Sequence, residues 1–265
     1  MNLLALKAKL PQAKPKGVIK MNIQKASELK IDPKLKVLVF GTYGCGKTHF
    51  LSTAPKPLIA DIDGGTSTLI KMQHINPDMG IVKISNTTDW LEFIRFVLQD
   101  KHSYETICVD SLTGLSRIIE RDDFTNEKNP VPNRGDYKIM LHKMRKEMSA
   151  LLCLPHHIIL TSLENLHKDS NGVILKGVPD LIGRQAEEVP GMIDYIGYLA
   201  SNTRTTGVER KLYFRPYSVY KSRDRVDILP KECKPNFGML IAELTNNINK
   251  YNTKGGDKNE NKSQP

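Results

Sequence analysis

Residues 36–48 read KVLVFGTYGCGKT, a short apolar run that leads directly into a glycine-rich loop. The run from Lys36 to Phe40 is rich in β-forming residues and predicts a buried strand. The loop has the spacing G-x-x-x-x-G-K-T, whose glycines let the backbone curl so that its N–H groups face inward. A strand, such a loop and a following helix together predict a binding site for phosphate groups.

The side chains at the end of the loop have the chemistry that a nucleoside triphosphate requires. Lys47 is expected to reach the β- and γ-phosphates, and the Thr48 hydroxyl to ligate Mg²⁺. GTPases recognise guanine with an N-K-x-D element, whereas residues 165–168 here read NLHK, so the expected cofactors are ATP and Mg²⁺. The predicted nucleotide-binding residues are Gly41, Thr42, Tyr43, Gly44, Cys45, Gly46, Lys47, Thr48 and His49.

Length and charge divide the chain into a core and two arms. The 265 residues suffice for one α/β domain with tails. Residues 1–36 hold nine lysines against two acids, and residues 246–265 hold four lysines against two acids, so most of the net charge of +10 lies at the ends. Basic ends can bind nucleic acid or can be solvated tails. We predict a basic N-terminal arm over 1–34, a core over 35–245 and a disordered C-terminal tail over 246–265.

The sequence predicts a cytoplasmic protein. No apolar run is long enough to span a bilayer, and the N-terminus lacks a basic start and a cleavage site, so neither a membrane partner nor a signal peptide is expected. The four cysteines are far apart and form no C-x-x-C pair, which indicates a reducing compartment and no structural zinc. They are Cys45, Cys108, Cys153 and Cys233.

Strand-like runs alternate with helical patterns through the core. The clearest helix spans Tyr137–Leu154, where apolar residues recur at spacings of three and four. This alternation predicts an α/β fold with a mainly parallel central sheet flanked by helices, and a ligand site at the carboxyl ends of the strands. After the first strand, the runs are 58–62, 81–84, 106–109, 158–161, 195–200 and 211–214.

An acidic residue ends the buried run at 106–109. Asp110 at that position can hold Mg²⁺ together with Thr48. The alternative is that Asp110 and Ser111 only cap the next helix. Beside a phosphate loop the metal role is favoured.

Two polar segments, 122–136 and 164–190, are longer than ordinary connections and are expected to have a use. An Asn171-Gly172 turn within the second segment predicts a β-hairpin, followed by a mobile loop. His156 and His157 have no partner at a spacing diagnostic of metal sites, so we expect them to lie at the surface.

Five stretches in order resemble one known family: the phosphate loop, IADIDGG at 59–65, TICVDSLTGL at 106–115, HHIILTS at 156–162 and VYKSRDR at 219–225. From about Leu35 to Pro230 the chain resembles the compact RecA-like ATPases of bacteriophages, the "AAA domain" proteins that include single-strand-annealing recombinases. The resemblance implies a RecA-like core, a host-cytoplasmic location and assembly into a homo-oligomeric ring or filament.

The resemblance also implies roles for further residues. Asp63, with Asp61 as the alternative, would polarise the attacking water; the family usually has Glu there, so hydrolysis is expected to be slow. A capping role for both aspartates is the competing interpretation. Thr161 or Ser162 would sense the γ-phosphate. Lys221 and Arg223 would complete a neighbouring subunit's site, and the alternative is an exposed basic turn.

The leading hypothesis is an ATP- and Mg²⁺-dependent DNA recombination protein that binds single-stranded DNA, and its further partner would be a single-strand-binding protein. A nucleotide-gated DNA-binding module with little ATP turnover is the alternative, ahead of a P-loop kinase or a ring helicase. Aromatic residues for base stacking are scarce in the two polar segments, which offer only Phe124 and Tyr137. The expected DNA contacts are the N-terminal arm, Arg134, Lys168, Lys176 and Arg184.

Overall fold

The computed structural model describes residue 25 and residues 34–71, 76–126, 128–205 and 207–256. The chain divides into two compact units, Met1–Ile31 and Asp32–Pro265, and the description below concerns the second. The N-terminal arm predicted for 1–34 therefore lies almost entirely outside the described residues.

A parallel sheet forms the centre of this unit. Its strands follow the order β7-β1-β5-β4-β2-β3, and every neighbouring pair in that run is parallel. The strand of the phosphate loop, β1, thus lies between β5 and β7, and β5 separates it from β4. The strands are β1 (Lys36–Gly41), β2 (Pro57–Asp61), β3 (Gly80–Lys83), β4 (Thr106–Asp110), β5 (His157–Lys168) and β7 (Tyr195–Arg204).

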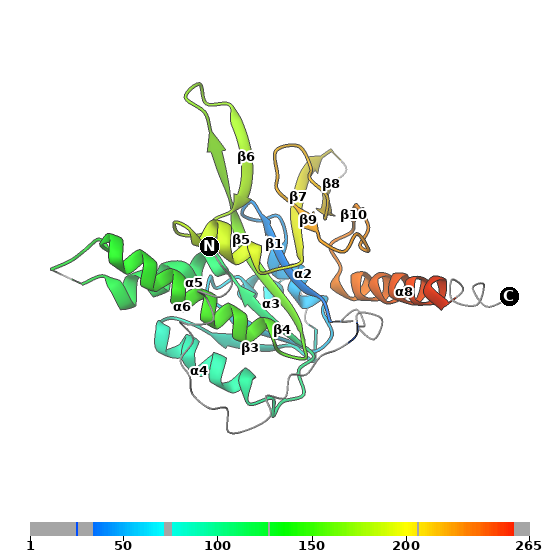
Figure 1. Ribbon diagram of the computed structural model, residues 1–265, viewed down its shortest axis with the longest axis horizontal. Coiled ribbons are helices and arrows are strands. Elements are labelled where there is room, and N and C mark those ends of the chain that lie inside the picture. Colours follow the sequence, from blue (N-terminus) through cyan, green and yellow to red (C-terminus); the bar gives the residue numbers. More distant parts are fainter. Residues whose placement is uncertain (1–24, 26–33, 72–75, 127, 206, 257–265) are drawn as a thin grey trace, which may run out of the picture. The chain divides into compact units, whose positions relative to one another are not determined.

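Antiparallel strands extend this sheet on one edge and form a hairpin from its middle. On the edge, β8 (Gly207–Tyr213) pairs with β7, and β10 (Glu232–Cys233) pairs with β8. The short β9 (Arg223–Asp224) also pairs with β7. From the middle, the second half of β5 turns back into β6 (Ile174–Pro179), and Figure 1 shows this hairpin extending beyond the sheet.

Helices cover the sheet. Four of them share one hydrophobic cluster with the strands, and Figure 1 shows α4, α5 and α6 on the same side. The rings of Phe50 in α2 and Phe237 in α8 instead meet each other edge to face at 5.7 Å. The elements are α2 (Lys47–Ser52), α3 (Thr66–Lys71), α4 (Thr87–Leu98), α5 (Leu112–Ile119), a π-helical turn η2 (Glu120–Phe124), α6 (Arg134–Leu152), α7 (Gln185–Gly191) and α8 (Phe237–Gly256).

Strands β1, β2 and β4 are buried on both faces, as expected for a parallel sheet between helices. Every residue of β2 and of β4 is buried. Strand β5 differs along its length: its first six residues are buried, and the six that follow are partly or fully exposed. The predicted fold class, α/β with a mainly parallel central sheet flanked by helices, is confirmed. Among the described helices none is both long and apolar enough to cross a bilayer.

Two predicted boundaries and one predicted loop were wrong. Helix α6 begins at Arg134 rather than Tyr137, because Asn133 and Asp136 form a reciprocal capping box. The mobile loop expected after the hairpin contains α7. The tail predicted to be disordered from 246 is helical up to Gly256, since α8 carries buried apolar residues as far as Ile248; residues 257–265 lie outside the described part.

His156 and His157 are also not surface residues. Both are buried, because the central strand β5 begins there. The Nδ1 atom of His157 accepts a hydrogen bond from the Leu35 N–H at 3.0 Å. The ring of His157 packs edge to face on Phe237. The lack of a partner at metal-site spacing had suggested the surface, and the packing around the start of β5 buries both residues instead.

The two faces of α6 provide a test of this packing. Met144 is fully buried, whereas Ile139 on the same helix is 58% exposed. Met144→Ala should lower the free energy of unfolding by about 2–5 kcal/mol, because it removes buried apolar atoms and leaves a cavity. Ile139→Ala should change it by less than about 0.5 kcal/mol. Denaturant unfolding followed by circular dichroism measures both, and equal effects would contradict the assignment of the buried face.

Candidate nucleotide site

The phosphate loop has the conformation that its glycines predict. Gly46 has φ of 105°, which a residue with a side chain rarely adopts, and α2 begins directly after it. A Cβ atom at Gly41 would lie 2.5 Å from the Leu199 carbonyl oxygen, so β7 can pair closely with β1 only if this residue is glycine. Tyr43 and His49 are exposed beside the loop, whereas Thr42 contributes its carbonyl group.

The Lys47 ammonium is folded back on the loop. It donates hydrogen bonds to the carbonyl oxygens of Gly41 at 2.9 Å and Thr42 at 2.7 Å. It also lies 3.7 Å from the Cys45 sulfur. Burial raises the pKa of the Cys45 thiol despite the nearby ammonium, so this side chain packs inside the loop as a neutral thiol. Lys47 is held at the loop by groups that a phosphate oxygen could replace.

Asp110 is the centre of the site. Its Oδ2 atom accepts a hydrogen bond from the Thr48 hydroxyl at 2.7 Å, and its Oδ1 atom accepts one from the Thr161 hydroxyl at 2.6 Å. The side chain is almost fully buried, which raises the pKa of Asp110, and the two hydroxyl hydrogen bonds oppose that rise. The capping alternative for Asp110 was wrong, since Ser111 caps α5 by accepting from the Gly114 N–H at 3.1 Å.

The two candidate sensor residues differ in what they contact. Thr161 reaches the Asp110 carboxylate directly. The Ser162 hydroxyl lies 3.0 Å from that of Thr113. Only Thr161 is therefore bonded to the acidic group of the site.

Asp61, the last residue of β2, and Asp63, two residues later, also differ in their contacts. Asp63 lies in the pocket and accepts a hydrogen bond from the Ser111 hydroxyl at 2.7 Å. The Asp110 carbonyl oxygen accepts from the backbone N–H groups of Ile62 and Asp63, at 2.7 and 3.2 Å, which fixes this turn over the site. Asp61 is buried and bonded to the Thr66 hydroxyl at the start of α3. Asp63, and not Asp61, therefore faces the space where a phosphate would lie.

These groups surround a pocket of about 620 Å³, which is within the usual size range for small-molecule sites. The loop, the turn after β2, helix α5 and strand β8 all contribute to it. The lining residues include Tyr43, Gly44, Gly46, Lys47, Thr48, His49, Asp63, Gly65, Thr68, Asp110, Thr113, Gly114, Arg117, Leu163 and Arg210.

The residues present fit a hard divalent cation such as Mg²⁺. Thr48 and Asp110 supply the hydroxyl and carboxylate oxygens that such an ion prefers. A Cβ atom at Gly65 would lie 2.8 Å from the Thr48 hydroxyl oxygen and 3.3 Å from Asp110 Oδ2. The space beside both oxygens is thus open only because residue 65 is glycine.

Arg210 was not predicted from the sequence. Its side chain lies against the phosphate loop, since a Cβ atom at Gly46 would be 3.0 Å from both Cδ and Nε of Arg210. The residue belongs to β8, which reaches the loop only through the antiparallel pairing of β7 with β8. No local motif marks it, so the sequence alone held no signal for this further cation at the pocket.

Lys221 and Arg223 do not line the pocket. The Arg223 guanidinium donates to the carbonyl oxygens of Pro190, at 2.7 Å, and Ile193 in its own chain, and burial lowers its pKa. Lys221 is exposed, and its backbone N–H donates to the Gly177 carbonyl. Their action on a neighbouring subunit stays a prediction, and for Arg223 it would require those carbonyl bonds to break.

The predicted DNA contacts lie in different settings. Lys168 and Lys176 stand on the two strands of the β5–β6 hairpin. Arg134 is exposed at the start of α6. Arg184 forms an ion pair with Glu188 at 2.9 Å. Of these four, the two hairpin lysines lie on an element that leads from the nucleotide site.

The fold and the phosphate loop together define a P-loop nucleotide-binding protein. The model of the family described as "AAA domain" matches residues 33–226, and the chain belongs to that family. No curated protein matches the chain. One similar solved structure is the KaiC-like protein of the hyperthermophilic archaeon Pyrococcus horikoshii OT3, with a TM-score of 0.41 and 14% identity, over 69% of this chain and 79% of that chain.

Arg210 and its neighbour Lys211 allow a matched test of the pocket. The two residues point to opposite faces of β8, and Lys211 forms an ion pair with Glu232 at 2.9 Å, away from the loop. Arg210→Ala should weaken ATP binding by about tenfold, because it removes a charge-assisted contact to phosphate. Lys211→Ala should leave ATP binding unchanged. Isothermal titration calorimetry measures the ATP affinity of both variants. An Arg210→Ala protein that binds ATP as tightly as the wild type would exclude a contact between Arg210 and phosphate.

Proposed function

We propose that this protein is an ATP- and Mg²⁺-dependent DNA recombination protein that binds single-stranded DNA and promotes annealing or strand pairing. The observation that carries the proposal is the course of β5. One continuous strand begins in the buried sheet, contacts Asp110 through Thr161 and then becomes the first strand of the exposed hairpin.

Strand β5 offers a direct path from nucleotide to hairpin. A triphosphate with its metal ion would compete for the Asp110 oxygen that now accepts from Thr48. Any shift of Asp110 would act on the Thr161 hydroxyl and hence on β5, which continues through Leu163 at the pocket to Lys168. Bound and free states would thus differ in a specific contact, which is what ligand-driven switching requires.

The hairpin has features that suit a single strand of nucleic acid. Lys168 and Lys176 supply positive charge for phosphates. The base of the hairpin is bonded to the segment that carries Tyr217 and Tyr220, which the sequence had not revealed. The Gly177 N–H of β6 donates to the Val219 carbonyl, and the Gly177 carbonyl accepts from the Lys221 N–H. Beside this junction the rings of Tyr213 and Tyr217 stack at 4.0 Å, and Tyr217 is 38% exposed. Exposed aromatic rings and positive charge are the features on which unpaired bases and their phosphates bind.

The residues of the pocket would divide the work of hydrolysis. Bound Mg²⁺ would neutralise charge on the phosphates, and Thr48 and Asp110 would hold it. Lys47 and Arg210 would bind phosphate oxygens with their cationic groups. Asp63 would take the proton of the attacking water, and its bond to Ser111 orients the carboxylate toward the pocket.

Assembly is part of the proposal. A homo-oligomeric ring or filament would bring Lys221 and Arg223 of one subunit to the nucleotide of the next. A single-strand-binding protein would deliver the DNA. Light scattering of the protein with ATP, with ADP and without nucleotide would show whether nucleotide changes the assembly.

DNA binding provides the principal test. Fluorescence anisotropy with a labelled oligonucleotide should show tighter binding with ATP than with ADP or no nucleotide. The double variant Lys168→Ala/Lys176→Ala should bind DNA more weakly, and the slope of log affinity against log salt should fall by about 0.7 for each lost phosphate contact. ATP affinity should not change, since neither lysine lines the pocket.

A matched control removes two exposed lysines of α6. Lys138→Ala/Lys146→Ala changes the net charge equally but lies on another surface. Equal loss of DNA affinity in both double variants would show that total charge, and not the hairpin, governs binding. DNA affinity that is the same in all three nucleotide states would refute nucleotide gating.

A second candidate, a nucleotide-gated binding module with little ATP turnover, is favoured by one observation. The carboxylate of Asp63 is already bonded to Ser111, and aspartate is one methylene shorter than the glutamate expected from the family resemblance. The general base would then reach the water poorly.

Turnover distinguishes the two candidates. Wild-type steady-state ATPase activity should be slow and should rise when single-stranded DNA is added. Asp63→Glu should raise the rate by bringing the carboxylate closer to the water, and Asp63→Asn should abolish it, with ATP affinity nearly unchanged in both. ATP-dependent DNA binding without DNA-stimulated turnover would support the gated module instead.

A further inference from the structure

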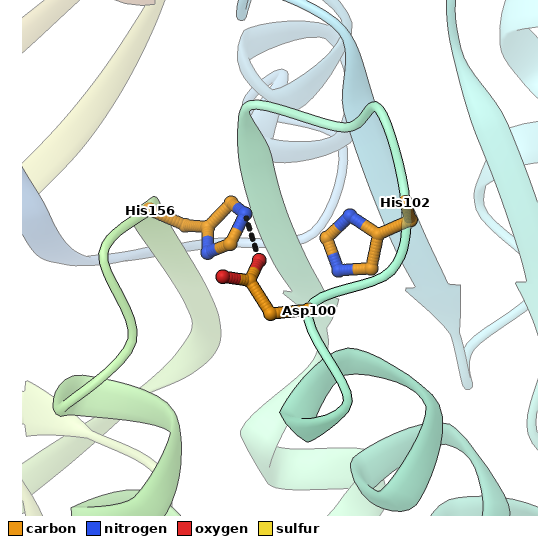
Figure 2. Close-up of side chains that lie close together, drawn as sticks. All are labelled: Asp100, His102 and His156. Atoms are coloured by element: carbon orange, nitrogen blue, oxygen red, sulfur yellow. Dashed lines mark ion pairs between the residues drawn. The ribbon is translucent and has the colours of Figure 1, made fainter.

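We propose that Asp100, His102 and His156 form a binding site for one divalent transition-metal ion, and that Zn²⁺ is the ion that suits it best. The site is separate from the nucleotide pocket and does not depend on the proposed function. Figure 2 shows the three side chains converging from two connections that are distant in the sequence. Asp100 and His102 lie between α4 and β4, and His156 lies between α6 and β5.

The sheet brings these two connections together. Strands β4 and β5 are parallel neighbours, and Thr106 at the start of β4 is in register with His157 at the start of β5. The residues just before both strands must therefore meet at the end of the sheet where these strands begin, which we call its amino-terminal edge. The nucleotide site lies at the opposite, carboxyl edge of the same two strands, where Asp110 and Thr161 are found.

The separations are those of a site that needs little adjustment. One ligand atom from each residue lies within 4.8 Å of the other two. The Nε2 atom of His156 is 3.3 Å from the Oδ1 atom of Asp100. Metal–ligand bonds of about 2.0–2.2 Å in a tetrahedral zinc site place ligand atoms about 3.3–3.5 Å apart. The first pair already has this spacing, and His102 needs only a small movement.

The histidine nitrogens lack other partners in the part of the chain that the structure describes. Nδ1 and Nε2 of His102 and Nδ1 of His156 are shielded from solvent and make no hydrogen bond. His156 as a residue is only 8% exposed. Buried polar atoms are nearly always paired, so the unpaired nitrogens of His102, beside the His156–Asp100 pair, call for a missing partner. The edge of the His102 ring that carries both nitrogens faces His156 and Asp100 (Figure 2).

The surroundings hold the ligands in place. The His102 ring stacks on Phe96 with centroids 5.4 Å apart, and it also contacts Tyr104. Asp100 follows the end of α4 with φ of 51°, a conformation that aspartate tolerates at helix ends. The Asp100 side chain is half exposed, which leaves an entry path and room for a water as the fourth ligand.

The chemistry of the donors selects the class of ion. Two imidazoles and one carboxylate match Zn²⁺ and related transition metals, whereas Mg²⁺ and Ca²⁺ prefer oxygen atoms alone. A bound ion would tie the start of β4 to the start of β5.

The test uses the full-length protein without a histidine tag, stripped of metal with a chelator. Isothermal titration with Zn²⁺ is done in excess Mg²⁺, which keeps the oxygen ligands of the nucleotide site occupied. One equivalent should bind. His102→Ala should weaken the binding by at least about tenfold, because it removes a direct ligand. Replacement of Zn²⁺ by Co²⁺ should give the visible absorption of a four-coordinate ion, and this signal should be lost in the variant.

Two further variants make the result decisive. His142→Ala removes an exposed histidine of α6 and should leave Zn²⁺ binding unchanged. Asp100→Asn keeps the size and backbone tolerance of the residue but removes its charge, so it should fold normally and still bind Zn²⁺ more weakly than the wild type. If His102→Ala fails to give a cooperative thermal transition, Asp100→Asn alone decides.

Two outcomes would overturn the proposal. The first is a wild-type protein that binds no equivalent of Zn²⁺. The second is Zn²⁺ binding that Asp100→Asn and His102→Ala leave as strong as in the His142→Ala control, which would place the ion elsewhere on the chain. A rise in the melting temperature with Zn²⁺ in the wild type, absent in Asp100→Asn, would confirm that the ion binds at Asp100 and stabilises the folded state.

Discussion

The buried carboxylate of Asp110 is held between two hydroxyl groups, and the rest of the site depends on this arrangement. Its side chain accepts from Thr48 of α2 and Thr161 of β5, and its carbonyl oxygen accepts from the turn that carries Asp63. A buried carboxylate is costly unless it is well hydrogen bonded. The position of Asp110 therefore sets the positions of the phosphate loop, the candidate sensor and the candidate base together.

Strand β5 gives this local network a longer reach. Its buried half lies between β1 and β4, and its exposed half forms the hairpin with β6. The hairpin is anchored at its base, where Gly177 pairs with the segment around Tyr220; a Cβ atom at Gly177 would lie 2.4 Å from the Tyr220 ring. The proposed coupling of ATP to DNA binding rests on this strand, which has one end at the pocket and an anchored hairpin at the other.

The two edges of the parallel sheet collect different chemistry. The carboxyl edge gathers Lys47, Thr48 and Asp110, because loops at that edge follow the strands and converge on one pocket. The amino edge gathers the three residues of the proposed metal site, because the connections before β4 and β5 must meet there. The same strand pairing thus builds both clusters, although no motif in the sequence links Asp100 to His156.

The sequence by itself determined the fold class and the phosphate loop, since strand, glycine spacing and helix are all local signals between Lys36 and Ser52. It also predicted the β5–β6 hairpin and the position of Asp110 at the end of a buried strand, which depend on short patterns; the metal role of Asp110 stays a prediction. Only the tertiary structure separated Asp63 from Asp61, placed Arg210 at the pocket and brought His102 to His156. The physical reason is that these contacts arise from strand pairing between residues distant in the chain, and such pairing leaves no periodic trace in the sequence.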